Sequence, residues 1–295
     1  DSMDNHALHL IQPIWPEFFN LLPKLNQDSS NFLDFAWLKI LLSKAFKHAN
    51  FSVQRLAILS IFDFDFKVYK PIGDLNFVCE DLILETKEPR LFIKRGRIGD
   101  RLVKFFQNYF AAISEELRPI AMTKLMKCLQ NKTMSKVPLS YYFKMLANLP
   151  VETPFFVTEN LESFEIIIDS HLAYITTWVQ IRCHSFILES LIKLCDPTKV
   201  SMNALWRVLE KIDAHVLNDE KLLQQVDKWL APFADAIITD LLALLKEIFT
   251  KEQDLKFAAE QSRRLALVLR LLARNEKNHE KIQTVLLAPL VEQIS

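Results

Sequence analysis

A cluster of basic side chains between residues 90 and 104 is the strongest chemical signal in the sequence. These fifteen residues contain one acid, Asp100, and six cations: Arg90, Lys94, Arg95, Arg97, Arg101 and Lys104. Lysine and arginine at this density supply the positive charge that contacts to nucleic-acid phosphates require. Gly96 and Gly99 flank Arg97 and would let backbone N–H groups approach a phosphate closely. A solvated basic loop without a ligand is the alternative, and both interpretations stay open.

Two further groups of cations follow predicted helices. The first could extend the basic surface, but lysines near a helix C-terminus also suit the helix dipole, and this simpler interpretation is favoured; it comprises Lys124, Lys127, Lys132 and Lys136. The second lies on one predicted helix near the end of the chain and comprises Arg263, Arg264, Arg270 and Arg274. Three of these arginines share a helix face, because they are spaced by seven and four residues. They could line a concave RNA-binding face, or pair with acids of the preceding helix, and the pairing with Asp235, Asp240 or Glu247 is favoured.

Residues for metal binding or nucleophilic catalysis are not arranged in any familiar pattern. His6 and His9 are close enough in sequence to share a metal, but no third ligand is nearby. The four cysteines, Cys79, Cys128, Cys183 and Cys195, show no CxxC spacing, and we expect Cys183 and Cys195 to be small buried side chains. All three glycines of the 295 residues lie between Gly73 and Gly99. Elsewhere this excludes glycine-dependent phosphate loops, dinucleotide turns and nucleophile elbows. We therefore predict no catalytic, cofactor-binding or metal-binding residue.

The elements that must position these side chains are predicted to be helices. Apolar residues recur with a helical period, and helical hairpins recur about every 40 residues, the spacing of HEAT-like repeats. The expected fold is all-α, a degenerate HEAT- or armadillo-like α-solenoid of antiparallel helix hairpins forming one array over residues 1–295. Two sub-blocks, 1–62 and 100–295, are separated by a loop-rich segment, 63–99. Within that segment we expect a short helix at 74–85 and a loop at 86–99.

The predicted helices alternate along the chain with short turns. Their ranges are 32–46, 53–61, 102–113, 120–129, 137–149, 161–175, 178–195, 201–212, 222–230, 233–249, 255–273 and 282–294. Pro232 is expected to break the helical path between two of them, since proline removes a backbone donor.

The overall composition limits the classes of partner. Thirty-six basic and 36 acidic residues give a formal net charge of zero, so any binding to nucleic acid has to come from a local patch. No uninterrupted apolar run reaches the length of a membrane span. Widely spaced cysteines in a chain with a large apolar core favour a reducing compartment, and we expect the cytoplasm, with the nucleus as an alternative.

The stretch from about Ile98 to Ile212 resembles a known family. The segments that carry the resemblance are 102–106, 113–117, 138–140, 144–150, 191–195 and 199–201. They are similar to the N-terminal helical region of TAR RNA-binding protein 1 and of the Trm-three-type tRNA (guanosine-2'-O-)-methyltransferases. These residues pack helices together and are no active-site signature.

The resemblance implies a role in tRNA modification. Proteins of that family have a long helical-repeat region followed by a knotted SPOUT domain, which binds S-adenosylmethionine and methylates a ribose 2'-hydroxyl in the tRNA D-loop. The present chain lacks that domain, so no catalytic residue can be transferred to it. It would be a non-catalytic part that holds tRNA, or that positions the catalytic domain or a second copy of the chain. The alternative is a HEAT-type scaffold for protein partners without nucleic-acid binding, which net neutrality favours. A stand-alone enzyme is a third possibility.

Overall fold

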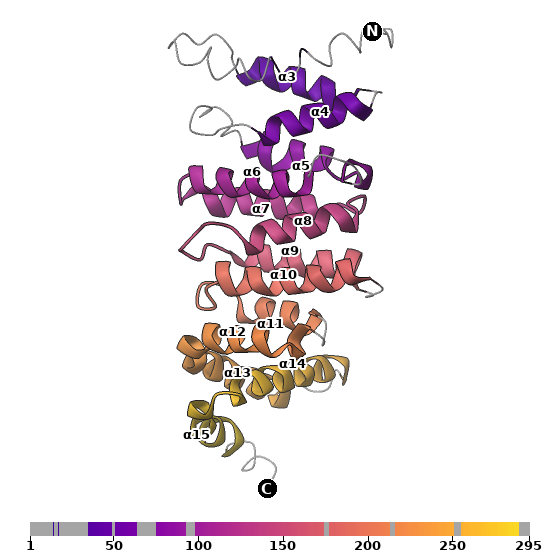
Figure 1. The fold of residues 1–295 in the computed structure, drawn as a ribbon. Coiled ribbons are helices and arrows are strands. Elements are labelled where there is room, and N and C mark those ends of the chain that lie inside the picture. Colours follow the sequence, from indigo (N-terminus) through magenta and orange to yellow (C-terminus); the bar gives the residue numbers. More distant parts are fainter. Residues whose placement is uncertain are drawn as a thin grey trace. The chain divides into compact units, whose positions relative to one another are not determined.

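The fold is built from helices throughout the residues that the structure describes (Figure 1). The computed structural model describes residues 14, 17, 35–48, 51–63, 75–92, 98–173, 177–212, 216–250 and 255–288. In these ranges the regular elements are α-, 3-10- and π-helices, and no strand occurs. The prediction of an all-α chain is therefore confirmed.

The chain divides into two compact units, each with its own internal contacts. Unit 1 is Asp1–Glu152 and unit 2 is Thr153–Ser295. The single array over residues 1–295, with its break at 63–99, stays a prediction.

Where the structure describes unit 1, it contains five longer helices and a few short turns. Its elements are α3 (Phe35–Phe46), α4 (Phe51–Phe62), the π-helical turn η2 (Phe77–Asp81), α5 (Leu82–Glu85), the 3-10 turn η3 (Pro89–Leu91), α6 (Ile98–Ala112), α7 (Leu117–Leu129) and α8 (Lys136–Ala147). Helix α6 packs against α4 and α8, while α7 packs against η2 and α5. The short helix predicted at 74–85 is confirmed, with a π-helical turn in its middle.

Aromatic rings from separate helices form much of the unit 1 core. Phe62 of α4 lies 5.3 Å from Phe105 of α6, and Phe106 lies edge-on to Tyr142 of α8 at 5.7 Å, both measured between ring centroids. The buried Tyr142 hydroxyl shares a hydrogen bond with the hydroxyl of Thr86, so its polar end is satisfied. Burial raises the pKa of Tyr142 far above its usual range. These contacts explain why phenylalanine at helical spacing defines the core here.

Gly99 corrects the expectation of a loop over residues 86–99. Residues 89–91 form the turn η3, and α6 already begins at Ile98, so Gly99 is a buried helical residue. A Cβ atom built on Gly99 would fall inside the ring of Tyr141, which stacks on Phe92 with centroids 5.4 Å apart. This glycine therefore serves the close approach of α6 to α8 rather than a flexible turn.

The described ranges of unit 2 contain six longer helices and several short helical turns. Its elements are α9 (Thr158–Ile167), the π-helical turn η4 (Ile168–Leu172), α10 (Trp178–Leu194), α11 (Met202–Lys211), the 3-10 turn η5 (Val216–Asn218), α12 (Glu220–Leu230), the 3-10 turn η6 (Ala231–Phe233), α13 (Ala234–Thr250), α14 (Leu255–Ala273), η7 (Glu276–Asn278), α15 (His279–Lys281) and the π-helical turn η8 (Ile282–Leu287). The predicted range of α14 is confirmed at both ends. Pro232 lies in η6, so the expected break is a tight turn between α12 and α13.

Polar contacts define the ends of several unit 2 helices. The Ser201 hydroxyl accepts from the Ala204 N–H at the start of α11, and Asp219 accepts from two N–H groups at the start of α12. At the C-terminal end of α10, the Leu194 carbonyl accepts from the N–H groups of Phe155 and Phe156, at 3.0 and 2.9 Å. Side-chain and backbone donors thus satisfy terminal groups that the helices themselves leave open.

Arg264 of α14 is held between helices by three oxygen acceptors. Its side chain contacts Glu210 at 3.3 Å and Asn203 at 2.9 Å, both on α11, and Gln261 at 3.1 Å on its own helix. Only 8% of Arg264 is exposed. A buried guanidinium needs such partners, because desolvation of an unpaired charge is very unfavourable.

Candidate nucleic-acid interface

The predicted basic surface is only partly covered by the described residues. The surface predicted to bind nucleic acid consists of the six cations of residues 90–104 together with Lys124 and Lys127. Of these eight, Lys94, Arg95 and Arg97 lie outside the described ranges. The other five belong to unit 1, and they are Arg90 on η3, Arg101 and Lys104 on α6, and Lys124 and Lys127 on α7. The cluster is therefore not one loop, because α6 takes up its second half.

Arg90 is exposed but already has two partners. Its Nε atom donates to the carboxylate of Glu88 at 3.0 Å, and its guanidinium lies 5.7 Å from the ring centroid of Phe51. The hydrogen bond from Arg90 lowers the pKa of Glu88. With 74% of its side chain exposed, Arg90 can still leave this arrangement, since exposed ion pairs are weak.

Two other cations of the predicted surface pair with acids from neighbouring segments. Arg101 donates to Asp63 at 2.7 Å, and Lys124 donates to Glu80 of η2 at 2.6 Å. The hydrogen bond to Glu80 raises the pKa of Lys124. Asp100, the acid inside the cluster, accepts from Lys144 of α8 at 3.2 Å. These pairs neutralise much of the charge that the sequence concentrates here.

Lys104 and Lys127 are the members of the predicted surface that carry no ion pair within the described ranges. Both are exposed, Lys104 in the middle of α6 and Lys127 in the last turn of α7. The position of Lys127 also fits the helix-dipole interpretation. Lys132 and Lys136, which follow along the chain, are exposed as well. Within the described part of the predicted surface, Lys104 and Lys127 are therefore the cations most available to an anion.

Of the three arginines that share a face of α14, Arg274 forms an ion pair as predicted, but with other acids than those expected. Arg274 donates to Asp227 at 3.0 Å and to Glu220 at 2.8 Å, both on α12. These hydrogen bonds, that to Asp227 foremost, raise the pKa of Arg274. The prediction that Arg274 pairs with an acid of α13 is therefore wrong. Asp235 of α13 accepts from Lys281 instead. The side chain of Glu247 lies outside the described set.

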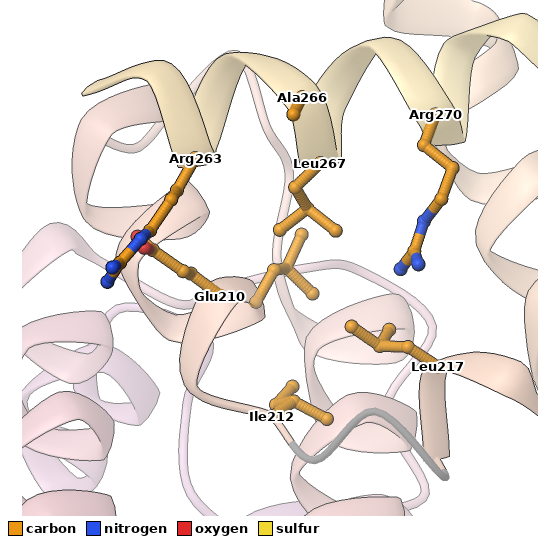
Figure 2. Close-up of a pocket in the computed structure, with 8 residues that line it drawn as sticks. Glu210, Ile212, Leu217, Arg263, Ala266, Leu267 and Arg270 are labelled. Carbon is orange, nitrogen blue, oxygen red and sulfur yellow. The ribbon is translucent and has the colours of Figure 1, made fainter. Parts of the chain in front are cut away.

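The two remaining arginines of α14 lie beside a cavity in unit 2. Arg263 and Arg270 are exposed, carry no ion pair among the described residues, and line a cavity of about 350 Å³. Figure 2 shows their guanidinium groups on either side of Ala266 and Leu267. The opposite wall comes from α11 and the chain that follows it, with Leu209, Ile212 and Leu217. We call this cavity the α11–α14 groove.

The cysteines behave as buried structural side chains. Cys79, Cys183 and Cys195 are buried, and Cys128 is intermediate. Burial raises the pKa of Cys79 and Cys195 to about 12 and that of Cys128 to about 11. Since the thiolate is the reactive form, these thiols are poor nucleophiles at neutral pH. The prediction of buried side chains is confirmed for Cys183 and Cys195.

The described part of the chain has neither a metal-ligand cluster nor a membrane-spanning helix. It contains no group of three or more His, Cys, Asp or Glu side chains placed to hold a metal ion. His6 and His9 lie outside that part. None of the helices described is both long enough and apolar enough to cross a bilayer.

Comparison with protein-family models, with curated proteins and with solved structures found no match to this chain. The resemblance to the tRNA methyltransferase family therefore stays an inference from the sequence segments that carry it.

The α11–α14 groove was not found by sequence reasoning. Its signal is present, because Arg263 and Arg270 bracket the apolar pair Ala266 and Leu267 at helical spacing. The opposite wall could not be predicted from the sequence, because it depends on how α11 packs against α14.

Proposed function

We propose that this chain is a non-catalytic α-helical segment that binds tRNA, within a SPOUT-class tRNA ribose 2'-O-methyltransferase. Its role is to hold tRNA for a catalytic domain that uses S-adenosylmethionine and lies elsewhere in the parent protein. The site of action is the cytoplasm, with the nucleus as the alternative. The sequence resemblance over residues 98–212 supports this assignment.

The packing order inside each unit supports a HEAT- or armadillo-like solenoid as the architecture. In unit 1, α6 packs on both α4 and α8, so helices two apart in order lie against each other. In unit 2, α9 packs on α11, α10 on α12, and α12 on α14 in the same way. Stacked hairpins produce this skipping pattern, because corresponding helices of successive repeats form a layer.

The observation that carries the tRNA proposal is the exposure of two lysines, Lys104 and Lys127. Their neighbours Arg101 and Lys124 each have an acid partner, whereas these two are exposed and form no ion pair with any residue that the structure describes. Such lysines on the helices of unit 1 supply sequence-independent contacts to phosphates. Lys94, Arg95 and Arg97 extend the same set in the sequence.

A gel-shift titration of tRNA at two ionic strengths tests this function. Replacing Lys104→Glu together with Lys127→Glu should weaken binding and make its salt dependence shallower by about one logarithmic unit per lost phosphate contact. Reversing Arg95 and Arg97 to Glu should weaken binding equally for different tRNA sequences. The control carries the same charge change at two exposed lysines of unit 2, Lys228→Glu and Lys277→Glu. Absence of any shift at low salt would remove direct tRNA contact from the proposal.

The second candidate function is a scaffold for protein partners without nucleic-acid binding. The α11–α14 groove favours it, because an apolar cavity flanked by charges is a surface that side chains of a protein fill well. A soluble complex with a protein partner, together with no affinity for tRNA, would replace the first proposal by this one.

A further inference from the structure

The α11–α14 groove has a net positive rim. Three charged side chains line it, Arg263, Arg270 and Glu210. Glu210 is compensated by the buried Arg264, whose Nε atom lies 3.3 Å from its carboxylate. The two exposed arginines have no such partner among the residues described. The groove therefore offers two cations to an incoming ligand.

The spacing of these cations is that of a helix. Arg263 and Arg270 are seven residues apart on α14, which places them about 10 Å apart along its axis. Ala266 and Leu267 lie between them, three and four residues after Arg263 (Figure 2). A second helix lying along α14 would repeat at the same rise, so its residues at i and i+7 can meet both arginines.

The wall between the cations is apolar. Leu209, Ile212 and Leu217 face the groove from the side opposite α14, and each is itself buried. Such a wall gives nothing to the phosphates or base edges of RNA, which need hydrogen-bonding groups. Aliphatic side chains gain from leaving water there.

We propose that the α11–α14 groove binds an amphipathic helix of a protein partner. Two acidic residues of that helix, seven positions apart, pair with Arg263 and Arg270. Two apolar residues, three and four positions after the first acid, fill the cavity between them. This pattern reads the same in either direction, so the groove accepts the helix parallel or antiparallel to α14. The inference stands apart from tRNA binding by unit 1.

The test uses a designed peptide as the probe. It is a fluorescein-labelled helix of about 18 residues, long enough to hold some helix in water, with two glutamates seven apart and two leucines at the positions between them. Fluorescence anisotropy should show saturable binding to the full chain. Replacing Arg263→Glu and Arg270→Glu should weaken it by at least about tenfold, because two attractive pairs become repulsive. The double variant Lys228→Glu and Lys277→Glu, which has the same net charge, should bind as well as the parent chain.

Two further measurements make the test specific to the groove. A peptide with lysines in place of both glutamates should bind the Arg263→Glu, Arg270→Glu chain better than it binds the parent. Replacing the exposed Ala266→Trp should block the cavity and reduce binding of the original peptide without unfolding the chain, as circular dichroism would verify.

The proposal is overturned if the peptide shows no saturable binding, or if the control chain loses affinity to the same extent. It is also overturned if a short RNA, rather than the peptide, binds in a manner that depends on Arg263 and Arg270. Light scattering covers the remaining case: self-association that disappears with the double arginine variant would assign the groove to a second copy of this chain.

Discussion

The cations of the predicted basic surface in unit 1 differ in their surroundings from the adjacent Arg263 and Arg264 of α14 in unit 2. In unit 1, Arg101 and Lys124 each pair with a single acid, at sites that are at least partly open to solvent. In unit 2, Arg264 is buried among three oxygen acceptors, while the preceding residue, Arg263, is exposed beside an apolar cavity. Two adjacent arginines thus have opposite roles, one in holding helices together and one available to a ligand. A basic cluster in a sequence does not reveal its function until the partner of each cation is known.

The largest change in stability is expected when Arg264 is replaced. Arg264→Ala removes the charge that compensates Glu210, and breaking a buried pair costs about 3–5 kcal/mol. Because Glu210 is partly exposed, with 28% of its side chain open to solvent, we expect the lower end of that range. Urea unfolding measures the difference. Arg263→Ala is the matched control and should change stability by less than about 0.5 kcal/mol. Equal changes in stability at both positions would show that Arg264 holds the helices together no more than Arg263 does.

The next effect concerns the close packing in unit 1. A helical glycine replaced by alanine normally gains up to about 1 kcal/mol, but at Gly99 the new methyl group meets the Tyr141 ring. Gly99→Ala should therefore destabilise the chain, by about 1–3 kcal/mol as for other overpacked sites. The sign should reverse in a Tyr141→Ala background, where the ring is gone, and a double-mutant cycle by thermal unfolding measures this coupling. Additive effects would show that the two residues do not meet.

The smallest expected effect is on the pH dependence of stability, and it concerns one half-buried carboxyl group in each unit. Burial raises the pKa of Glu85 in unit 1 and of Asp240 in unit 2. A carboxyl whose folded pKa is raised holds its proton more tightly in the native state, so its contribution to stability is fullest at low pH and is lost as the pH rises through the folded pKa. The substitutions Glu85→Gln and Asp240→Asn replace the carboxyl by an amide that does not ionise, so the stability no longer falls as the pH rises. Each variant should be more stable than the parent at neutral pH, by less than about 1 kcal/mol since both groups are partly solvated.

Urea midpoints across the acidic range measure that pH dependence. The advantage of each variant should vanish as the pH falls to the ordinary values of 4.5 for Glu85 and 3.8 for Asp240. A variant that is less stable than its parent at neutral pH would mean that the ionised carboxylate makes a favourable contact in the folded state.

Local sequence patterns predicted the helices well and the tertiary partners poorly. The apolar period of α14 predicted both of its ends, because apolar residues recur along this helix at helical spacing. The start of α6 was missed, since Gly99 reads locally as a loop residue, and only Tyr141 from α8 explains it. Acid partners for Arg274 were expected on α13, yet they lie on α12, because helix packing decides which helix faces α14. The basic surface was visible in the sequence, but the acids that neutralise Arg101 and Lys124 come from residues about 40 positions away.

The double hydrogen bond to the Leu194 carbonyl has a practical consequence for anyone dividing this chain. The donors, Phe155 and Phe156, precede α9 and meet a helix end some forty residues further on. An expression fragment of unit 2 that starts at Thr158 would omit both donors and the buried ring of Phe156. Such a fragment would contain all of α9, but the C-terminal end of α10 would fray because the Leu194 carbonyl would lose both donors. A well-behaved recombinant fragment therefore has to include the extended residues ahead of α9.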